Sequence, residues 1–236
     1  MSSSRTPAFE HIKSAGHSET ALETFALKLV RYGSLAFTAS IFLLVLSSTT
    51  SSSLSWFTLH PLAQSLSVLL FSWGIAPLQP PSPSAAAERT RRFETHQSFA
   101  LAGHAIFLLG SFSIAYNKYL RGAPHFTTWH GLLGIISVGL AFSQVAGGLA
   151  STWEKGKLVG GEVKGKKLYK YHRVGGYAFM TLFLFSAHLG GAHSLWATRQ
   201  EGTMSLVLRV VANWIALPAV WTGLMLRLRP SKMNIF

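Results

Sequence analysis

The chain has 236 residues, of which 49% are apolar and only 12% are charged, and its formal net charge is +13. Strongly apolar stretches recur along it, which excludes an ordinary soluble domain and indicates an integral membrane protein. The sequence contains no cysteine, so disulfides, thiolate metal sites and iron–sulfur clusters are excluded.

Six apolar stretches are long enough to cross a membrane. A hydrocarbon core of about 30 Å requires about 20 helical residues. The connections between the stretches are too short to hold a second domain. We therefore predict an all-α, six-helix membrane bundle as one transmembrane domain over residues 31–229, with a partly disordered tail at 1–30 and a short tail at 230–236. The predicted spans are 32–51, 58–78, 95–116, 129–150, 172–194 and 205–227.

Lys and Arg are distributed unevenly between the two sides of the predicted bundle. The segments before the first span, after the second, after the fourth and after the sixth hold 17 of the 21 Lys and Arg residues. The positive-inside rule therefore predicts that both termini are cytosolic. It explains the net charge without a nucleic-acid partner, and it leaves plasma membrane, vacuole, endosome and endoplasmic reticulum equally open.

Acidic residues are absent from the interior of the spans. All eight are glutamates, and each lies in a tail, a connection or a helix end. Proton-coupled transporters and ion pumps normally carry a carboxylate within the membrane, so the pattern disfavours those classes. Imidazole is then the main polar group inside the membrane.

Four histidines, His60, His96, His130 and His172, stand at the N-terminal ends of spans two to five. Because successive spans run in opposite directions, His60 and His130 fall near one membrane face and His96 and His172 near the other. A neutral imidazole in hydrocarbon needs a partner, which could be a side chain, a backbone carbonyl or a metal. For one histidine alone an interfacial role is the commoner explanation. Four in register favour two b-type haems, each with two axial histidines.

The sequence around these histidines resembles the cytochrome b561 family of transmembrane ascorbate-dependent reductases, in a short form with only the core domain. The resemblance covers roughly residues 55–195. It implies a four-helix core of spans two to five that holds two haem b groups and is flanked by spans one and six. The motifs that carry it are Leu59-His60-Pro61, Thr95-His96, Thr128-Trp129-His130-Gly131, and Leu168-Tyr169-Lys170-Tyr171-His172 followed by Gly175-Gly176-Tyr177.

The resemblance also implies a function, which is the transfer of single electrons across a membrane. Cytosolic ascorbate would reduce an inner haem, and an outer haem would reduce monodehydroascorbate or a ferric chelate on the lumenal or extracellular side. The resemblance implies that His60 and His130 hold the outer haem, and that His96 and His172 hold the inner one. These four side chains would be the axial ligands of the two haem irons.

Basic residues near each pair are candidates for binding anionic substrates. Beside the inner pair we predict Arg92 and Lys167 for ascorbate, with Lys170 and Arg173 as further candidates or as partners of haem propionates. Contact with lipid headgroups explains any single one of them equally well.

On the outer side, Lys118, together with Arg121 and His125 just before His130, is the candidate for receiving an anionic or ferric acceptor. Exposed polar connections often have such a composition without any substrate.

Other interpretations stay open from the sequence. A non-enzymatic channel, carrier or assembly protein would carry interfacial histidines without haem, and a quinone-linked haem b oxidoreductase would not use ascorbate. His104, His188 and His193 are additional histidines; His188 lies about 24 Å from His172 along a helix, where it could replace an outer ligand. A homodimer is also compatible with the sequence.

Aromatic side chains are numerous, and most have a simple explanation. Phe107, Phe142 and Phe183 could lie between the two haems. Packing or lipid contact is the default expectation for a phenylalanine within a membrane span.

Overall fold

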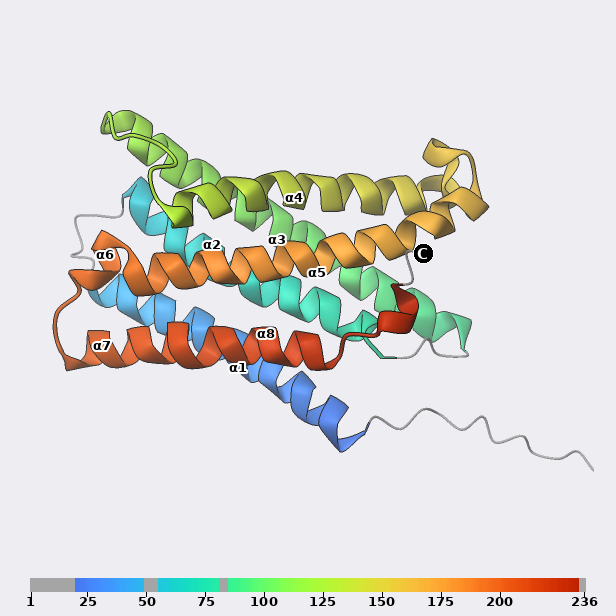
Figure 1. Ribbon diagram of the computed structural model, residues 1–236, viewed down its shortest axis with the longest axis horizontal. Coiled ribbons are helices and arrows are strands. Elements are labelled where there is room, and N and C mark those ends of the chain that lie inside the picture. The colour runs from blue at the N-terminus through green and yellow to red at the C-terminus, as the bar shows by residue number, and fades with distance from the viewer. Residues whose placement is uncertain (1–19, 49–54, 81–84, 234–236) are drawn as a thin grey trace, which may run out of the picture.

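The computed structural model describes residues 20–48, 55–80 and 85–233, and within these ranges it contains helices and no strands (Figure 1). Six helical stretches are long and apolar enough to cross a membrane, which confirms the all-α, multi-pass bundle. Short 3-10 turns follow α2 at Ala76–Leu78, α4 at Trp153–Lys155 and Lys157–Val159, and α8 at Pro230–Lys232. The helices in chain order are α1 (Ala21–Ser48), α2 (Trp56–Ile75), α3 (Ala86–Leu120), α4 (Trp129–Thr152), α5 (Glu162–His193), α6 (Leu195–Thr198), α7 (Thr203–Val210), a π-helix (Val211–Ala216) and α8 (Leu217–Leu226).

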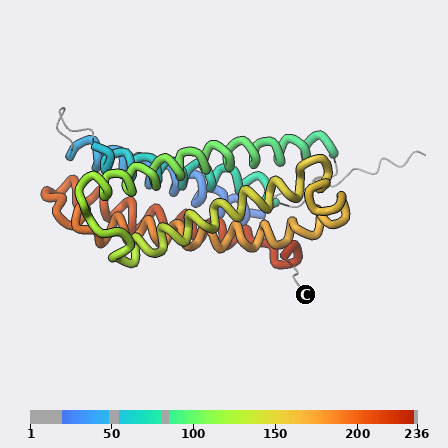
Figure 2. The backbone as a smooth tube through the Cα atoms, turned by 90° about the horizontal axis from the view of Figure 1, so that it is seen from above, coloured from blue at the N-terminus to red at the C-terminus, as the bar shows by residue number. Residues whose placement is uncertain are grey.

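The long helices lie along one axis of the molecule (Figures 1 and 2). One end of the bundle contains the starts of α1, α3 and α5 and the ends of α2, α4 and α8; we call it the basic end. The opposite end contains the starts of α2, α4 and α7 together with α6. The sixth span consists of α7, the π-helix and α8 in succession, and α1 packs against it and against α2.

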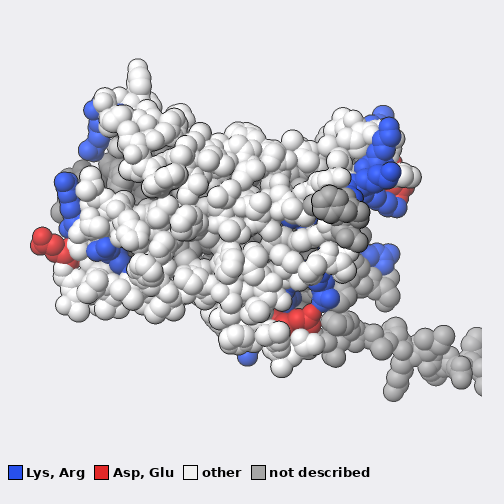
Figure 3. Space-filling model, viewed as in Figure 1, with Lys and Arg blue, Asp and Glu red and all other residues white. Residues whose placement is uncertain are grey.

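Charged side chains gather at the two ends of the bundle, and the face seen in Figure 3 has an almost uncharged band between them. Hydrocarbon around the bundle requires such a band. Among the described Lys and Arg residues, only Lys118, Arg121, Arg199 and Arg209 belong to the opposite half. The basic end is therefore the end that the positive-inside rule assigns to the cytosol, and this orientation stays a prediction.

Three helices extend well beyond the apolar stretches that predict them. α1, α3 and α5 begin at residues 21, 86 and 162, rather than near 32, 95 and 172. The added turns of α3 and α5 are polar and contain ion pairs one turn apart, Arg92–Glu88 at 2.8 Å and Lys166–Glu162 at 2.6 Å. Such pairs and helix-forming residues continue a helix into water, where hydropathy does not detect it.

The predicted tails are affected by these longer helices. Residues 21–30, assigned to the N-terminal tail, form the first turns of α1, and residues 1–19 lie outside the described part of the chain. In the C-terminal tail, Pro230–Lys232 forms a 3-10 turn, and residues 234–236 are outside the described part. The division into domains at residues 31 and 229 stays a prediction.

The four central helices form two hairpins. α2 packs along α3, and α4 packs along α5, whereas the two hairpins meet each other over much shorter stretches. Buried aromatic rings occupy part of this meeting surface, among them Phe71 on α2, Phe107 on α3 and Phe183 on α5. The gap between the hairpins is where the four histidines lie.

Side-chain caps fix the starts of α2 and α4. Ser55 Oγ accepts a hydrogen bond from the backbone N–H of Thr58 at 3.3 Å, and the hydroxyl of Thr58 accepts one from the N–H of Ser55. Thr128 Oγ1 accepts from the N–H of Gly131 at 3.2 Å. Caps of this kind satisfy backbone donors that the helix leaves free. They place His60 and His130 in the first turns of α2 and α4.

Close contact between α1 and the sixth span depends on two glycines. A Cβ atom on Gly223 of α8 would lie 2.6 Å from the carbonyl oxygen of Ala26, and one on Gly33 of α1 would lie 3.1 Å from the carbonyl oxygen of Ala216. Small residues allow membrane helices to approach at backbone distance. The flanking pair α1–α8 is therefore held by packing and not by ion pairs within the membrane.

We expect Gly223→Ala to destabilise the bundle, because the backbone of α1 cannot move away as a side chain could. A cost of about 1–3 kcal/mol is typical of overpacking, and it should lower the midpoint of thermal unfolding in detergent by several degrees. Gly139→Ala is the matched control, since a Cβ on Gly139 would meet nothing within 4 Å. Equal midpoints for the two variants would contradict this account of the α1–α8 contact.

Candidate functional site

His60 and His130 lie together near the opposite end of the bundle. Their ring centres are 6.0 Å apart, so the pair joins α2 of one hairpin to α4 of the other. The Nδ1–H of His60 donates to the carbonyl of Gly110 on α3 at 2.9 Å, and that of His130 donates to the carbonyl of Ser186 on α5 at 2.8 Å. The structure brings together the two residues that the sequence pairs at this level.

His96 and His172 form the second pair, toward the basic end. Their ring centres are 6.2 Å apart, and the pair joins α3 to α5. The Nδ1–H of His96 donates to the carbonyl of Gly74 on α2 at 3.0 Å. Nδ1 of His172 is buried, and this histidine lies beside the backbone of Gln144 on α4 without a hydrogen bond of ordinary length and angle from Nδ1. Gly148 of α4 packs against this ring, where a Cβ would lie 3.3 Å from Cε1.

The spacing of both pairs fits a six-coordinate haem iron. Iron–nitrogen bonds of about 2 Å, with the short distance from each nitrogen to its ring centre, put two axial imidazole centres roughly 6 Å apart. No group of three or more metal-binding side chains occurs among the described residues, so neither pair resembles a site for a bare metal ion with a full set of protein ligands. Two histidines from opposing hairpins match the needs of a flat macrocycle.

The hydrogen bonds of the imidazoles also fit metal coordination. A carbonyl can only accept, so His60, His96 and His130 each carry their proton on Nδ1. Nε2 then keeps its lone pair, and no described residue donates a hydrogen bond to it. Histidine ligands in proteins are usually oriented by this kind of bond on the other nitrogen. The residues present therefore fit haem, and their role as ligands stays a prediction.

A cluster of phenylalanines occupies the space between the two pairs. Phe71, Phe107, Phe179 and Phe183 are all buried, with ring centres 5.0–6.3 Å apart. Phe71 lies three residues before Gly74, and Phe107 three residues before Gly110, the residues that anchor the two pairs. Of the three phenylalanines singled out from the sequence, Phe107 and Phe183 belong to this cluster. Phe142 is 53% exposed on the outside of α4.

The basic residues predicted beside His96 and His172 occupy different surroundings. Arg92 is largely buried and pairs with Glu88, whereas Lys170 lies 5.2 Å from the ring centre of Tyr171. Lys167 is exposed and Arg173 half-buried. None of the four lines the cavity of about 330 Å³ at this end of the bundle. That cavity is lined by Phe93, Ser151, Thr152, Lys155, Glu162, Lys166 and Tyr169.

The C-terminal turn contributes to this basic region, which sequence reasoning missed. Lys232 donates to the carbonyl of Pro80 at 3.4 Å. Burial, followed by the positive charges of three nearby guanidinium groups, lowers the pKa of Lys232 below that of an ordinary lysine. Those groups belong to Arg173, Arg229 and Arg92. Four cations from α3, α5 and the C-terminal turn thus converge near His172, although they are far apart in the sequence.

A buried amide ties this region to the flanking helices. Gln79 donates to the hydroxyl of Tyr177 and to the carbonyl of Leu224, both at 3.0 Å, and its side-chain oxygen accepts from Arg227. Arg227 is only 4% exposed, and Arg229 forms an ion pair with Glu23 of α1. This network fastens α1, α2, α5 and the end of α8 at the basic end.

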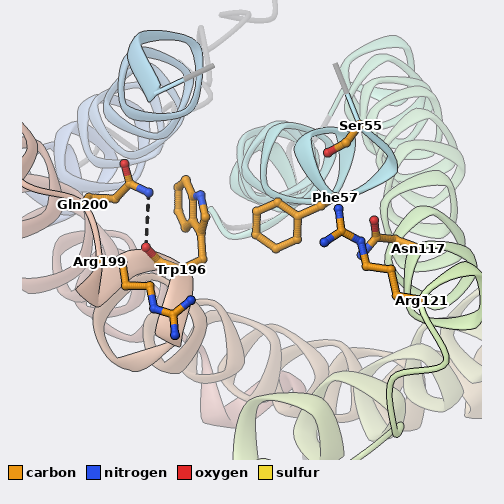
Figure 4. Close-up of a pocket in the computed structure, with 7 residues that line it drawn as sticks. All are labelled: Ser55, Phe57, Asn117, Arg121, Trp196, Arg199 and Gln200. Carbon is orange, nitrogen blue, oxygen red and sulfur yellow. Dashed lines mark hydrogen bonds between the residues drawn. The ribbon is translucent and has the colours of Figure 1, made fainter. Parts of the chain in front are cut away.

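At the opposite end, not all of the residues predicted to bind the acceptor line the cavity found there. Lys118 donates to the carbonyl of Pro124 at 2.9 Å, and His125 lies beside Phe126 on the loop after α3. Neither lines the cavity of about 290 Å³ at this end of the bundle (Figure 4). Arg121 and Arg199 line this cavity from opposite sides. Its other lining residues are Ser55, Phe57, Asn117, Trp196 and Gln200.

The cavity lies close to the pair because its walls continue the same helices. Phe57 is one turn before His60 on α2, and Asn117 is two turns after Gly110 on α3. Phe57 and Trp196 face each other with ring centres 5.6 Å apart, and Gln200 donates to the carbonyl of Trp196 (Figure 4). Arg199 is isolated in the sequence, and only the fold brings it opposite Arg121.

The additional histidines do not join either pair. His104 contacts Phe142 at 5.4 Å between ring centres. His188 donates from Nδ1 to the carbonyl of Asn213 at 3.0 Å, and it lies 5.7 Å from His193 and 4.7 Å from Trp214. The contacts of His188 with Asn213 and Trp214 point to the sixth span and away from the gap between the hairpins.

Comparison with known families supports the arrangement. The family model described as eukaryotic cytochrome b561 matches residues 59–198, which is more than half of the chain and includes all four paired histidines. This match confirms the family resemblance inferred from the histidine motifs. No curated protein sequence matches the chain.

We expect Gly190→Ala to remove one haem selectively. A Cβ on Gly190 would lie 2.7 Å from Cε1 and 2.9 Å from Nδ1 of His130, so the ring must leave its position. Pyridine-haemochrome analysis should then find about half the wild-type haem, with the His96–His172 site still filled. Gly134→Ala is the control, because its Cβ would lie 3.8 Å from the nearest atom. Full haem content in Gly190→Ala would argue against His130 as a ligand.

Proposed function

The chain belongs to the eukaryotic cytochrome b561 family, and from this membership we propose that it passes single electrons from ascorbate at the basic end to an anionic acceptor at the opposite end. The family consists of transmembrane oxidoreductases that bind haem b, and these general properties hold for the chain. The number of haems, their ligands, the donor and the acceptor are the parts that we propose.

Two haem b groups are proposed, one between His60 and His130 and one between His96 and His172. When bound, such a haem exchanges one electron at its iron, and two axial histidines leave no open position for a substrate. The chain holds each imidazole in a fixed orientation and keeps water away at the level of the hydrocarbon. The observation that carries this proposal is the pair of ring-centre distances, 6.0 and 6.2 Å, each across the gap between the hairpins.

The phenylalanine cluster supports transfer between the two levels. His60 and Gly74, which mark the two levels on α2, are 14 residues apart, or about 21 Å along the helix axis. Dense aromatic packing fixes this separation and excludes water from the space between the pairs. No titratable side chain is placed within the cluster, so electron movement there does not need a proton to move with it.

Ascorbate is proposed as the donor because the basic end favours a small anion. Arg92, Arg173 and Lys232 converge near His172, and Lys167 adds an exposed cation on the same helical extension of α5. Electrostatic attraction of this kind raises the local concentration of an anion and weakens as salt increases. Lys170 and Arg173 stay candidates for haem propionates.

The acceptor is proposed to bind in the cavity between Arg121 and Arg199. An anion such as monodehydroascorbate, or a carboxylate chelate of ferric iron, would place its charge between two guanidinium groups. Lys and Arg are rare in this half of the bundle, yet two of the four line one cavity. Asn117 and Ser55 add polar groups to the lining of the cavity, and Phe57 and Trp196 add aromatic rings. Lys118 and His125 do not line this cavity, and they stay alternative candidates for binding the acceptor.

The test of the proposed function is a reduced-minus-oxidised absorbance spectrum with haem quantitation, followed by titration with ascorbate. We expect two haems per chain, both reduced by ascorbate. His96→Ala and His172→Ala should each lose one haem, whereas His104→Ala, eight residues from His96 on the same helix, should keep both. A folded, haem-supplied preparation without haem would refute the proposal. Reduction by a quinol but not by ascorbate would favour the quinone-linked alternative.

We expect Arg121→Gln and Arg199→Gln each to lower kcat/KM for an anionic acceptor by about tenfold or more, since a charge-assisted hydrogen bond contributes about 1.5–3 kcal/mol. Haem content and reduction by ascorbate should not change, because both residues are at the other end of the bundle. The measurement is the rate of acceptor reduction by the prereduced protein at low and high salt.

Lys118→Gln is the comparison that separates the cavity from the neighbouring loop. It removes the same charge from the same end without changing the lining of the cavity. A larger loss with Lys118→Gln than with either arginine variant would place the acceptor on the loop instead.

A further inference from the structure

A second group of imidazoles lies on the far side of α5 from the haem-binding gap. His188 and His193 have ring centres 5.7 Å apart, and Trp214 of the π-helix packs against both, at 4.7 and 6.2 Å. His188 is half-buried and His193, the last residue of α5, is exposed. Nothing in the proposed electron transfer uses either histidine.

The π-helix orients one of these imidazoles. Residues 211–216 wind more widely than an α-helix, which changes the pairing of their carbonyl groups. The carbonyl of Asn213 accepts the Nδ1–H of His188 at 3.0 Å. This is the same arrangement that orients His60, His96 and His130, and it leaves the lone pair on Nε2 of His188. No described residue donates a hydrogen bond to that atom or to the ring of His193.

The contacts around the π-helix fix its position against α5. Asn213 is fully buried, and a Cβ on Gly191 would lie 2.2 Å from its side-chain oxygen. Its side-chain nitrogen donates to the carbonyl of Arg209 at 2.9 Å, while the oxygen has no partner among the described residues. Packing therefore fixes the backbone of α5 against the π-helix at the level of His188 and His193.

The nitrogen atoms of the two imidazoles determine which metal ions the site can bind. Two imidazoles without a carboxylate suit zinc, copper, iron or nickel, and they do not suit magnesium or calcium, which prefer oxygen ligands. Since the described residues hold no cluster of three metal-binding side chains, at least two coordination positions would be left for water or an anion. With only two protein ligands, the ion would be held less tightly than in a closed structural site with four, so it can exchange.

The positive charge of nearby Arg209 disfavours a divalent cation that has no anionic ligand. Arg209 donates to the carbonyl of Ala192, next to His193, at 3.3 Å, and its Nε is buried without a partner among the described residues. Its positive charge favours an ion that keeps an anionic ligand in an open position. Glu201, on the connection before α7, is the carboxylate of the described chain at this end, and it lies outside any metal-binding group.

We propose that His188 and His193 form an exchangeable binding site for a first-row transition-metal ion of the zinc or copper type at the opposite end of the bundle. The site stands on its own geometry and does not require the proposed electron transfer. Gly190, which lies between the two histidines in the sequence, contacts His130, so only the width of α5 separates the metal site from that pair.

The test uses the full-length, haem-loaded protein in detergent, without a polyhistidine tag. Equilibrium dialysis against ZnCl₂ with metal analysis should find one Zn²⁺ per chain that an excess of Mg²⁺ or Ca²⁺ does not displace. With CuCl₂, the paramagnetic resonance spectrum should show coupling to imidazole nitrogen. His193→Ala should weaken Zn²⁺ binding by about tenfold or more, with unchanged haem content.

His125→Ala is the control, because it removes an exposed histidine from the same end of the bundle and leaves the site intact. It should bind Zn²⁺ as the wild type does. Since His193 is exposed at a helix end, its variant should fold even if His188→Ala does not. Equal Zn²⁺ affinity in His193→Ala and wild type, or loss of binding in His125→Ala, would overturn the proposal.

Discussion

Hydrogen bonds from imidazole Nδ1 to backbone carbonyls of neighbouring helices are the interaction on which this bundle depends. In hydrocarbon an unsatisfied polar group costs several kcal/mol, so each histidine needs a partner that water cannot supply. His60 and His96 meet this need reciprocally, since each bonds to a glycine carbonyl on the other helix of the α2–α3 hairpin. His130 does the same between α4 and α5. The bonds that set the register of each hairpin also turn Nε2 into the gap between the hairpins, so folding and cofactor geometry have one cause.

The two ends of the molecule differ in how they hold positive charge. At the basic end, cations from α3, α5 and the C-terminal turn crowd together, and the buried Gln79 and Arg227 fasten the flanking helices there. At the opposite end, the few cations are dispersed, but two of them face one cavity. Between the ends the interior is aromatic and uncharged. Such an arrangement suits a chain that attracts anions to both faces and lets only the electron pass between them.

The sequence predicts the spans and the histidine pairs because both follow from simple periodicities, the length of a membrane helix and the alternation of its direction. It does not predict where α3 and α5 begin, since their polar turns have no hydropathy signal. Arg121 and Arg199 are 78 residues apart, so only the fold, which brings the end of α3 opposite the end of α6, can identify their shared cavity. The π-helix and the contact of Gly190 with His130 depend on backbone shifts of a few tenths of an ångström, and residue types do not encode such shifts.

One helix, α5, takes part in both histidine pairs and in the site of His188 and His193. It carries His172, supplies two rings of the phenylalanine cluster, accepts the hydrogen bond of His130 and presents His188 on its outer face. An insertion of a single residue between His172 and Ser186 would rotate everything beyond it by about 100° and shift it by about 1.5 Å. All later contacts of the helix would then be lost together. The number of residues between His172 and Ser186 is therefore constrained by both histidine pairs and by the site of His188 at once.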